Sequence, residues 1–162
     1  MSTLYVDNLQ PNLGSRVMAA GHVVQVAYNN ATGGSSTAVA TVTNNIADTA
    51  TGFYAEITPT SSNSKILVML TSNLQHTGAS NQGIIWGMRR GTTPIARNGN
   101  FDYIEYTSAD TNFHTTVNLK YVDAPATTSL LRYELYLSNY SGGSTWVRNW
   151  GTKNITLMEI AQ

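Results

Sequence analysis

Residues 53–71 read Phe-Tyr-Ala-Glu-Ile-Thr-Pro-Thr-Ser-Ser-Asn-Ser-Lys-Ile-Leu-Val-Met-Leu-Thr. Residues 53–58 alternate between two kinds of side chain, as a strand with one solvated face does. Residues 59–64 are turn-forming, because Pro lacks a backbone donor and Ser, Asn and Thr hydrogen-bond locally. Residues 66–70 are all apolar, which is typical of a strand covered on both faces. The stretch predicts a hairpin-like pair of strands at the centre of an all-β domain.

The second face of this apolar strand needs a cover. Ile66, Val68 and Leu70 fill one face, while Leu67 and Met69 fill the other. Either the opposite sheet of the same chain or a neighbouring subunit covers Leu67 and Met69, and the sequence leaves both alternatives open. These two residues are therefore the candidate subunit-interface residues.

The remaining chain continues the strand pattern. Alternating segments are separated by turn residues, with Asn98-Gly99 as a strong hairpin signal and with polar connections expected at 44–51 and 72–82. The expected strands are 21–28, 37–43, 84–90, 94–97, 101–106, 112–123, 131–138, 145–150 and 154–160. No segment has a convincing helical period. Residues 21–162 are thus predicted to form a single antiparallel β-sandwich that is jelly-roll-like.

Residues 1–20 have no sustained period and cannot close a core alone. They carry large apolar side chains around Pro11 and Gly14, including Leu4, Val6, Leu9 and Leu13. Such a segment is either a frayed terminus or an extended arm that lies on another molecule. The apolar content favours a docking arm, because a disordered tail carries few large apolar residues.

The composition limits the function. Charged residues make up 11% of the 162 residues, the net charge is zero, and there is no cysteine. A balanced charge argues against nucleic-acid binding and against a polybasic membrane contact. No apolar run approaches the length of a membrane span, and residues 1–8 are too polar for a signal peptide.

Groups that could support catalysis or metal binding are scattered. They are the three histidines His22, His76 and His114 and the acidic cluster of Asp102, Glu105 and Asp110. No histidine pair has metal-ligand spacing, and no nucleophile elbow or phosphate-binding loop occurs. We predict a non-enzymatic protein with no catalytic residues, no metal and no cofactor.

Residues 140–150 are the most distinctive surface candidate. In an extended chain Trp146, Arg148 and Trp150 project to one side, near Tyr140. Aromatic and guanidinium groups stack on sugar rings and also anchor protein interfaces. The stripe is a candidate ligand or subunit contact, and burial of both tryptophans against the core is the alternative.

Five segments, in the same order, resemble small tail-fibre or virion appendage proteins of tailed bacteriophages, especially phages of aquatic bacteria. The segments are 2–8 (STLYVDN), 21–26 (GHVVQV), 57–68 (ITPTSSNSKILV), 123–128 (DAPATT) and 155–160 (ITLMEI). The resemblance implies a virion structural protein on the particle exterior, a β-sandwich that forms a homotrimer, and an N-terminal segment that faces the particle.

From this resemblance we expect a tail or neck fibre component. Its arm would bind other virion proteins and its outer loops would meet a host-surface glycan, with no nucleic-acid partner and no membrane insertion. A capsid decoration or cement protein would use the same fold and arm. A glycan-processing enzyme is a more distant alternative, because it needs a carboxylate pair in a cleft.

Overall fold

A computed structural model of the chain describes residues 20–31, 49–77, 82–97, 112–140, 143–147 and 153–162. These residues form strands and connections, and they contain no helix that is long and apolar enough to cross a membrane. The strands of the described part are β1 (Val23–Ala31), β2 (Thr49–Ile57), β3 (Lys65–Thr77), β4 (Gly83–Arg90), β5 (Thr93–Arg97), β6 (Asn112–Asp123), β7 (Leu131–Tyr140), β8 (Ser144–Val147) and β9 (Lys153–Ile160).

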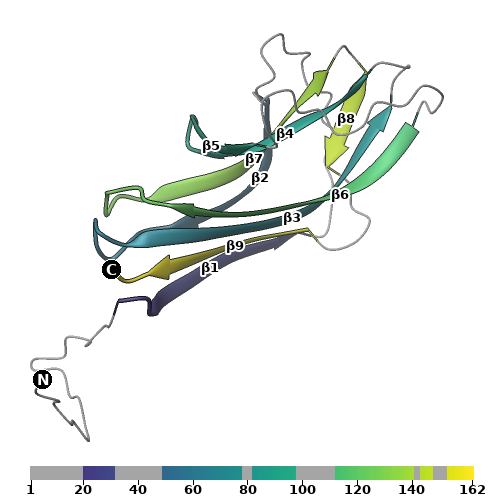
Figure 1. Cartoon of the computed structure of the whole chain (residues 1–162). Helices are drawn as coiled ribbons and strands as arrows, with labels where there is room; N and C mark the ends of the chain where they lie inside the picture. The colour runs from purple at the N-terminus through teal and green to yellow at the C-terminus, as the bar shows by residue number, and fades with distance from the viewer. Residues whose placement is uncertain (1–19, 32–48, 78–81, 98–111, 141–142, 148–152) are drawn as a thin grey trace, which may run out of the picture.

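The strands form two antiparallel sheets that pack face to face (Figure 1). Sheet A has the order β1-β9-β3-β6, with β8 also paired to β3, and sheet B has the order β2-β7-β4-β5. The pairs β1 with β9, β2 with β7, β3 with β6, and β4 with β5 are nested along the chain. Such nested pairs, folded over into two sheets, make a jelly roll. The predicted all-β, jelly-roll-like sandwich is confirmed.

The core lies between the inner faces of the two sheets. Its strands alternate because successive side chains point to opposite faces, so every second residue of β3 and β9 is buried. The largest fully buried side chains of this core are Ile66, Leu70, Leu74, Ile84, Met88, Tyr133, Leu135, Leu137, Ile155 and Leu157.

The central stretch is not a hairpin, so that prediction is wrong. β2 pairs with β7 in sheet B, whereas β3 pairs with β6 and β9 in sheet A. Residues 58–64 do turn the chain, but they carry it from one sheet to the other. The buried Glu159 holds this turn, because its carboxylate accepts hydrogen bonds from the Thr60 backbone nitrogen and hydroxyl, both at 2.8 Å.

Two expected polar connections are partly strand. β3 continues to Thr77, since β6 pairs with it over residues 66–77 and β8 supports its last four residues on the other edge. The inner face of β3 becomes polar there, with Ser72 and His76 buried, which explains why sequence pattern suggested a loop. Residues 49–51, expected in a connection, begin β2.

The first and the last described residues of the chain lie side by side. The Gly21 nitrogen donates to the Ala161 carbonyl at 2.8 Å, and the Ala161 nitrogen donates to the His22 carbonyl at 2.9 Å. These bonds extend the β1·β9 ladder by one step beyond Val23 and Ile160. Residues 20–22 therefore lie beside residues 161–162 at the same end of sheet A.

Candidate functional site

The outer face of sheet A carries an apolar row. Cross-strand partners share a face, so the register gives the rows directly. Val26, Met158, Leu67 and Val122 lie side by side across four strands. Val26 and Val122 at the two edges are each 51% exposed, and Leu67 and Met158 between them are half-buried.

Neighbouring rows widen this surface. Met69 is half-buried between Thr156 and Lys120, and Tyr28, at the end of the same row, is 67% exposed. On the other side of the first row, Ile160 pairs with Val23. We call this surface the apolar band: Val23, Val26, Tyr28, Leu67, Met69, Val122, Met158 and Ile160.

A neutral polar ladder continues the same face. Asn30, Asn154, Thr71 and Asn118 form the next row, and Asn73 pairs with Thr116 beyond it. Their side chains bond across strands: the Thr71 hydroxyl donates to Asn118 Oδ1 at 2.8 Å and the Thr116 hydroxyl to Asn73 Oδ1 at 2.7 Å. Asn154 Nδ2 also donates to Asn30 Oδ1. In these rows only Lys65 and Lys120, beside the apolar band, carry charge.

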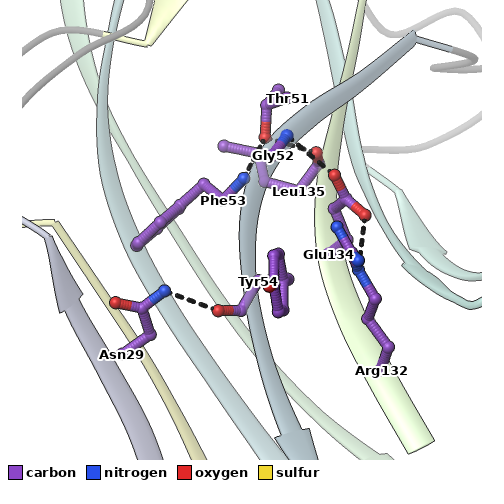
Figure 2. A network of polar contacts seen from close by, with 8 residues as sticks. All are labelled: Asn29, Thr51, Gly52, Phe53, Tyr54, Arg132, Glu134 and Leu135. Atoms are coloured by element: carbon purple, nitrogen blue, oxygen red, sulfur yellow. Dashed lines mark hydrogen bonds and ion pairs between the residues drawn. The ribbon is translucent and has the colours of Figure 1, made fainter.

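The outer face of sheet B has a different chemistry, which Figure 2 shows in part. The Arg132 guanidinium lies 3.5 Å from the centre of the Tyr54 ring, and the Arg89 guanidinium lies 4.5 Å from that of Tyr136. Each pair is a cation–π contact made within the chain. The rings are thus already covered by arginines of neighbouring strands.

On the same face, Glu134 of β7 binds both a backbone amide of β2 and the side chain of Arg132. Its buried carboxylate accepts the Gly52 amide at 2.7 Å and Arg132 Nε at 3.0 Å (Figure 2). Gly52 has a φ of +72° and lies in the register shift between Ala50 and Tyr54. A bulge of this kind turns an amide out of the ladder, and the carboxylate binds it.

Two further carboxylates are buried and serve the fold. Asp123 accepts Arg90 Nη1 at 2.6 Å and the Tyr133 hydroxyl at 2.7 Å, and this ties β6 of sheet A to β4 and β7 of sheet B. Burial and the bond to Asp123 raise the pKa of Tyr133. Burial alone would raise the pKa of Glu159, but hydrogen bonds from Gln25, Ser64 and Thr60 outweigh it and hold the pKa below its usual value.

The histidines do not converge. His22 and His114 are exposed at separate places, and His76 is buried in β3, where burial lowers its pKa. Within the described ranges no group of three His, Asp or Glu side chains could hold a metal ion. The acidic cluster Asp102, Glu105 and Asp110 lies outside the described residues.

The predicted site residues fall into three groups. Leu67 and Met69 lie on the outer face of sheet A, at the centre of the apolar band. Tyr140 and Trp146 belong to different sheets, since Tyr140 ends β7 opposite Gly83 and Trp146 pairs with Gln75 of β3. The others, Leu4, Val6, Leu9, Leu13, Arg148 and Trp150, lie outside the described residues.

The arginine–tyrosine pairs and the Glu134 network were not predicted. Residues 131–138 do show their outward alternation in the sequence, with Arg132, Glu134 and Tyr136 at every second position. Their partners Tyr54 and Arg89 come from strands far apart in the chain. That pairing depends on the strand register, which the sequence pattern does not contain.

No family model matches the chain, and no curated protein is significantly similar to it. Among solved structures, the crystal structure of the VP2 subviral particle of infectious bursal disease virus is similar, with a TM-score of 0.45 and 10% sequence identity. The alignment covers 96% of this chain and 37% of that chain.

Proposed function

We propose that the chain is a non-enzymatic structural protein of a virion, a tail or neck fibre component that assembles as a homotrimer. The observation that carries this proposal is the apolar band on the outer face of sheet A, with Leu67 and Met69 at its centre. The resemblance to phage appendage proteins supplies the class of particle.

The band is unusual for a solvated sheet face. An antiparallel sheet with one wet side normally carries polar residues there. Here the row through Leu67 is apolar on all four strands, with Val26, Met158 and Val122, and the rows on either side add Tyr28, Met69, Val23 and Ile160. A contiguous apolar surface of this kind is typical of a protein interface. Covering it with the bands of the two other copies around a three-fold axis would remove apolar area from water without burying a carboxylate.

The neighbouring ladder suits the same use. Its amide and hydroxyl groups already bond to each other across strands, so burial leaves fewer groups without a partner than a charged surface would. A trimer built on sheet A would leave sheet B outward, where the arginine–tyrosine pairs keep a solvated face. This arrangement favours a particle component with one face for assembly and one face for solvent.

Docking and host contact complete the proposal. The arm residues Leu4, Val6, Leu9 and Leu13 would bind another virion protein, because they are apolar anchors on a segment without a core. The region of Tyr140, Trp146, Arg148 and Trp150 would meet a host-surface glycan through stacking.

The experiment that tests the function is a cryo-electron microscopy map of the intact particle. We expect three copies around an axis at the tail or neck, with sheet A facing the axis. Copies spread over the capsid lattice would instead identify a decoration protein. Absence of the chain from purified particles would overturn the virion proposal.

The arm has its own test. Changing Leu4, Val6 and Leu9 together to serine should lower incorporation into particles at least about tenfold, since each buried large side chain contributes roughly 1.5–3 kcal/mol. The matched control changes Leu130, an exposed loop leucine, to serine. Normal incorporation of the triple variant would contradict docking through the arm.

A further inference from the structure

Lys153 is a buried lysine in the core of the sandwich. It is the first residue of β9 and lies on the inner face of that strand, the same face that carries the core residues Ile155 and Leu157. Only 5% of its surface is exposed. Lysine is almost never buried to this degree without a partner for its charge.

The described surroundings offer Lys153 no carboxylate. Its Nζ lies 5.2 Å from the centre of the Phe53 ring, which comes from β2 of sheet B. The ion pairs of the described residues are Arg90 with Asp123 and Arg132 with Glu134, and Lys153 takes part in neither. A ring face compensates only a small part of the cost of taking an ammonium group out of water. Burial accordingly lowers the pKa of Lys153.

A second buried donor lies beside it. Thr71 pairs with Asn154, so the next residues along each strand, Ser72 and Lys153, are neighbours, and both lie on the inner face of sheet A. Ser72 is fully buried, and its hydroxyl oxygen has no hydrogen-bond partner. A buried hydroxyl without a partner costs about 1–3 kcal/mol.

We propose that Lys153 and Ser72 bind a small monovalent anion, of the size of chloride, between the two sheets. An ammonium group has three donors and no acceptor, and a serine hydroxyl can supply one more donor, so the shared need is for an acceptor that carries negative charge. A water molecule would satisfy the hydroxyl but would leave the buried charge uncompensated. The burial of both residues restricts the ligand to a small ion.

Such an ion would connect the sheets at this level. Lys153 reaches from sheet A over Phe53 of sheet B, so an anion on its ammonium group fixes the lysine across the interior. The ion would bind only the folded protein and would therefore stabilise it by mass action. This site is independent of whether the protein belongs to a virion.

The first test uses the purified full chain. Thermal unfolding is followed at constant ionic strength while sodium gluconate, whose anion is too large to enter, is replaced by sodium chloride. We expect the Tm to rise by about 5 °C and then to level off as the site saturates. A Tm that does not respond to chloride overturns the proposal. That result would be expected if Lys153 were a neutral amine that accepts a hydrogen bond from the Ser72 hydroxyl.

Variants locate the effect. Lys153→Met should abolish the chloride response, and Ser72→Ala should weaken it. The matched control is Lys65→Met, which removes an exposed lysine on the outer face of the same sheet and should keep the full response. Equal chloride responses in the wild-type protein and in Lys153→Met overturn the proposal.

A second measurement does not depend on a variant that folds. Crystals of the wild-type protein grown with sodium bromide in place of chloride should show an anomalous peak within about 3–3.5 Å of Lys153 Nζ. A crystal with ordered density for both side chains and no such peak overturns the site.

Discussion

The outer faces of the two sheets carry different kinds of side chain. Sheet B covers Tyr54 and Tyr136 with arginines and pairs Arg132 with Glu134, so these groups have partners within the chain. Sheet A presents the apolar band beside a neutral Asn and Thr ladder, with lysines only next to the band. The described arginines and tyrosines of the first face have their partners in the monomer, whereas the apolar band of the second face would lose exposed apolar area if another copy covered it. This difference is the reason why we propose sheet A as the side for assembly.

The largest expected effect comes from a charge placed at the centre of the apolar band, and it tests the assignment of sheet A as the assembly side. Leu67→Glu should reduce self-association at least about 100-fold, because a carboxylate would have to be buried where a leucine packs. Sedimentation velocity over a concentration series measures the effect, and circular dichroism checks that the fold is kept.

The control for this change lies on the other sheet. Glu56→Lys also alters charge at an exposed strand position of sheet B and should leave self-association unchanged. If Glu56→Lys dissociates the protein and Leu67→Glu does not, the two faces have been assigned the wrong way round.

The second effect concerns the stability of the monomer. Glu134→Ala should lower the free energy of unfolding by about 2–3 kcal/mol, because the Gly52 amide and the Arg132 guanidinium lose a charged acceptor. Urea unfolding measures it. Thr71→Ala, which removes one ladder bond on sheet A, should lower the free energy of unfolding by less than about 1 kcal/mol. Equal losses of stability in the two variants would contradict the proposed difference between the faces.

The third effect is a pH dependence that arises inside the sandwich, at the turn between the two sheets. The folded pKa of Glu159 lies below its unfolded value, so its contribution to stability is fully present above about pH 4.5 and is lost as the pH falls through the folded pKa. Below that pH the turn at residues 58–64 should exchange its amide protons faster, starting at Thr60, which hydrogen exchange detects.

Glu159→Gln provides the matched control for the acid effect. The amide keeps the size of the carboxylate but does not titrate, so the decrease in stability below pH 4.5 should become smaller. An unchanged acid profile in this variant would show that another carboxylate controls the transition.

The smallest effect tests the stacking on sheet B. Arg132→Lys keeps the charge but loses the flat guanidinium that covers Tyr54, and should cost about 0.5–1 kcal/mol of unfolding free energy. Lys120→Arg on sheet A should change stability by less than about 0.5 kcal/mol. A neutral result for Arg132→Lys would mean that neither the ring contact nor the Nε bond to Glu134 contributes measurably to stability.

Local alternation predicted the strands well where one face was apolar. The strand Asn112–Asp123 begins and ends at the predicted residues, and the outward row of residues 131–138 was visible as well. The pattern failed for residues 72–77 because buried Ser72 and His76 read as loop residues, although pairing on both edges keeps them in β3. Polar residues that are buried weaken the period-two signal.

Contacts between distant strands could not be predicted. The turn at 59–64 was recognised, but whether it closes a hairpin or crosses between sheets depends on the partners of β2 and β3 in the second half of the chain. The prediction that Leu67 and Met69 need a cover followed from one strand alone. The extent of the apolar band did not, because it requires the register of β1, β6 and β9.

The bonds between Gly21 or His22 and Ala161 make the sandwich nearly a closed loop of chain. A short Gly-Ser linker from residue 162 to residue 20 would complete that loop, and new ends could then be opened in the exposed turn at residues 126–130. Such a circular permutant would keep every strand pair of both sheets. It would also let a label or a fused domain be placed in the turn between β6 and β7, which lies at the same end of sheet A as Ile160, while the strands of both sheets are kept.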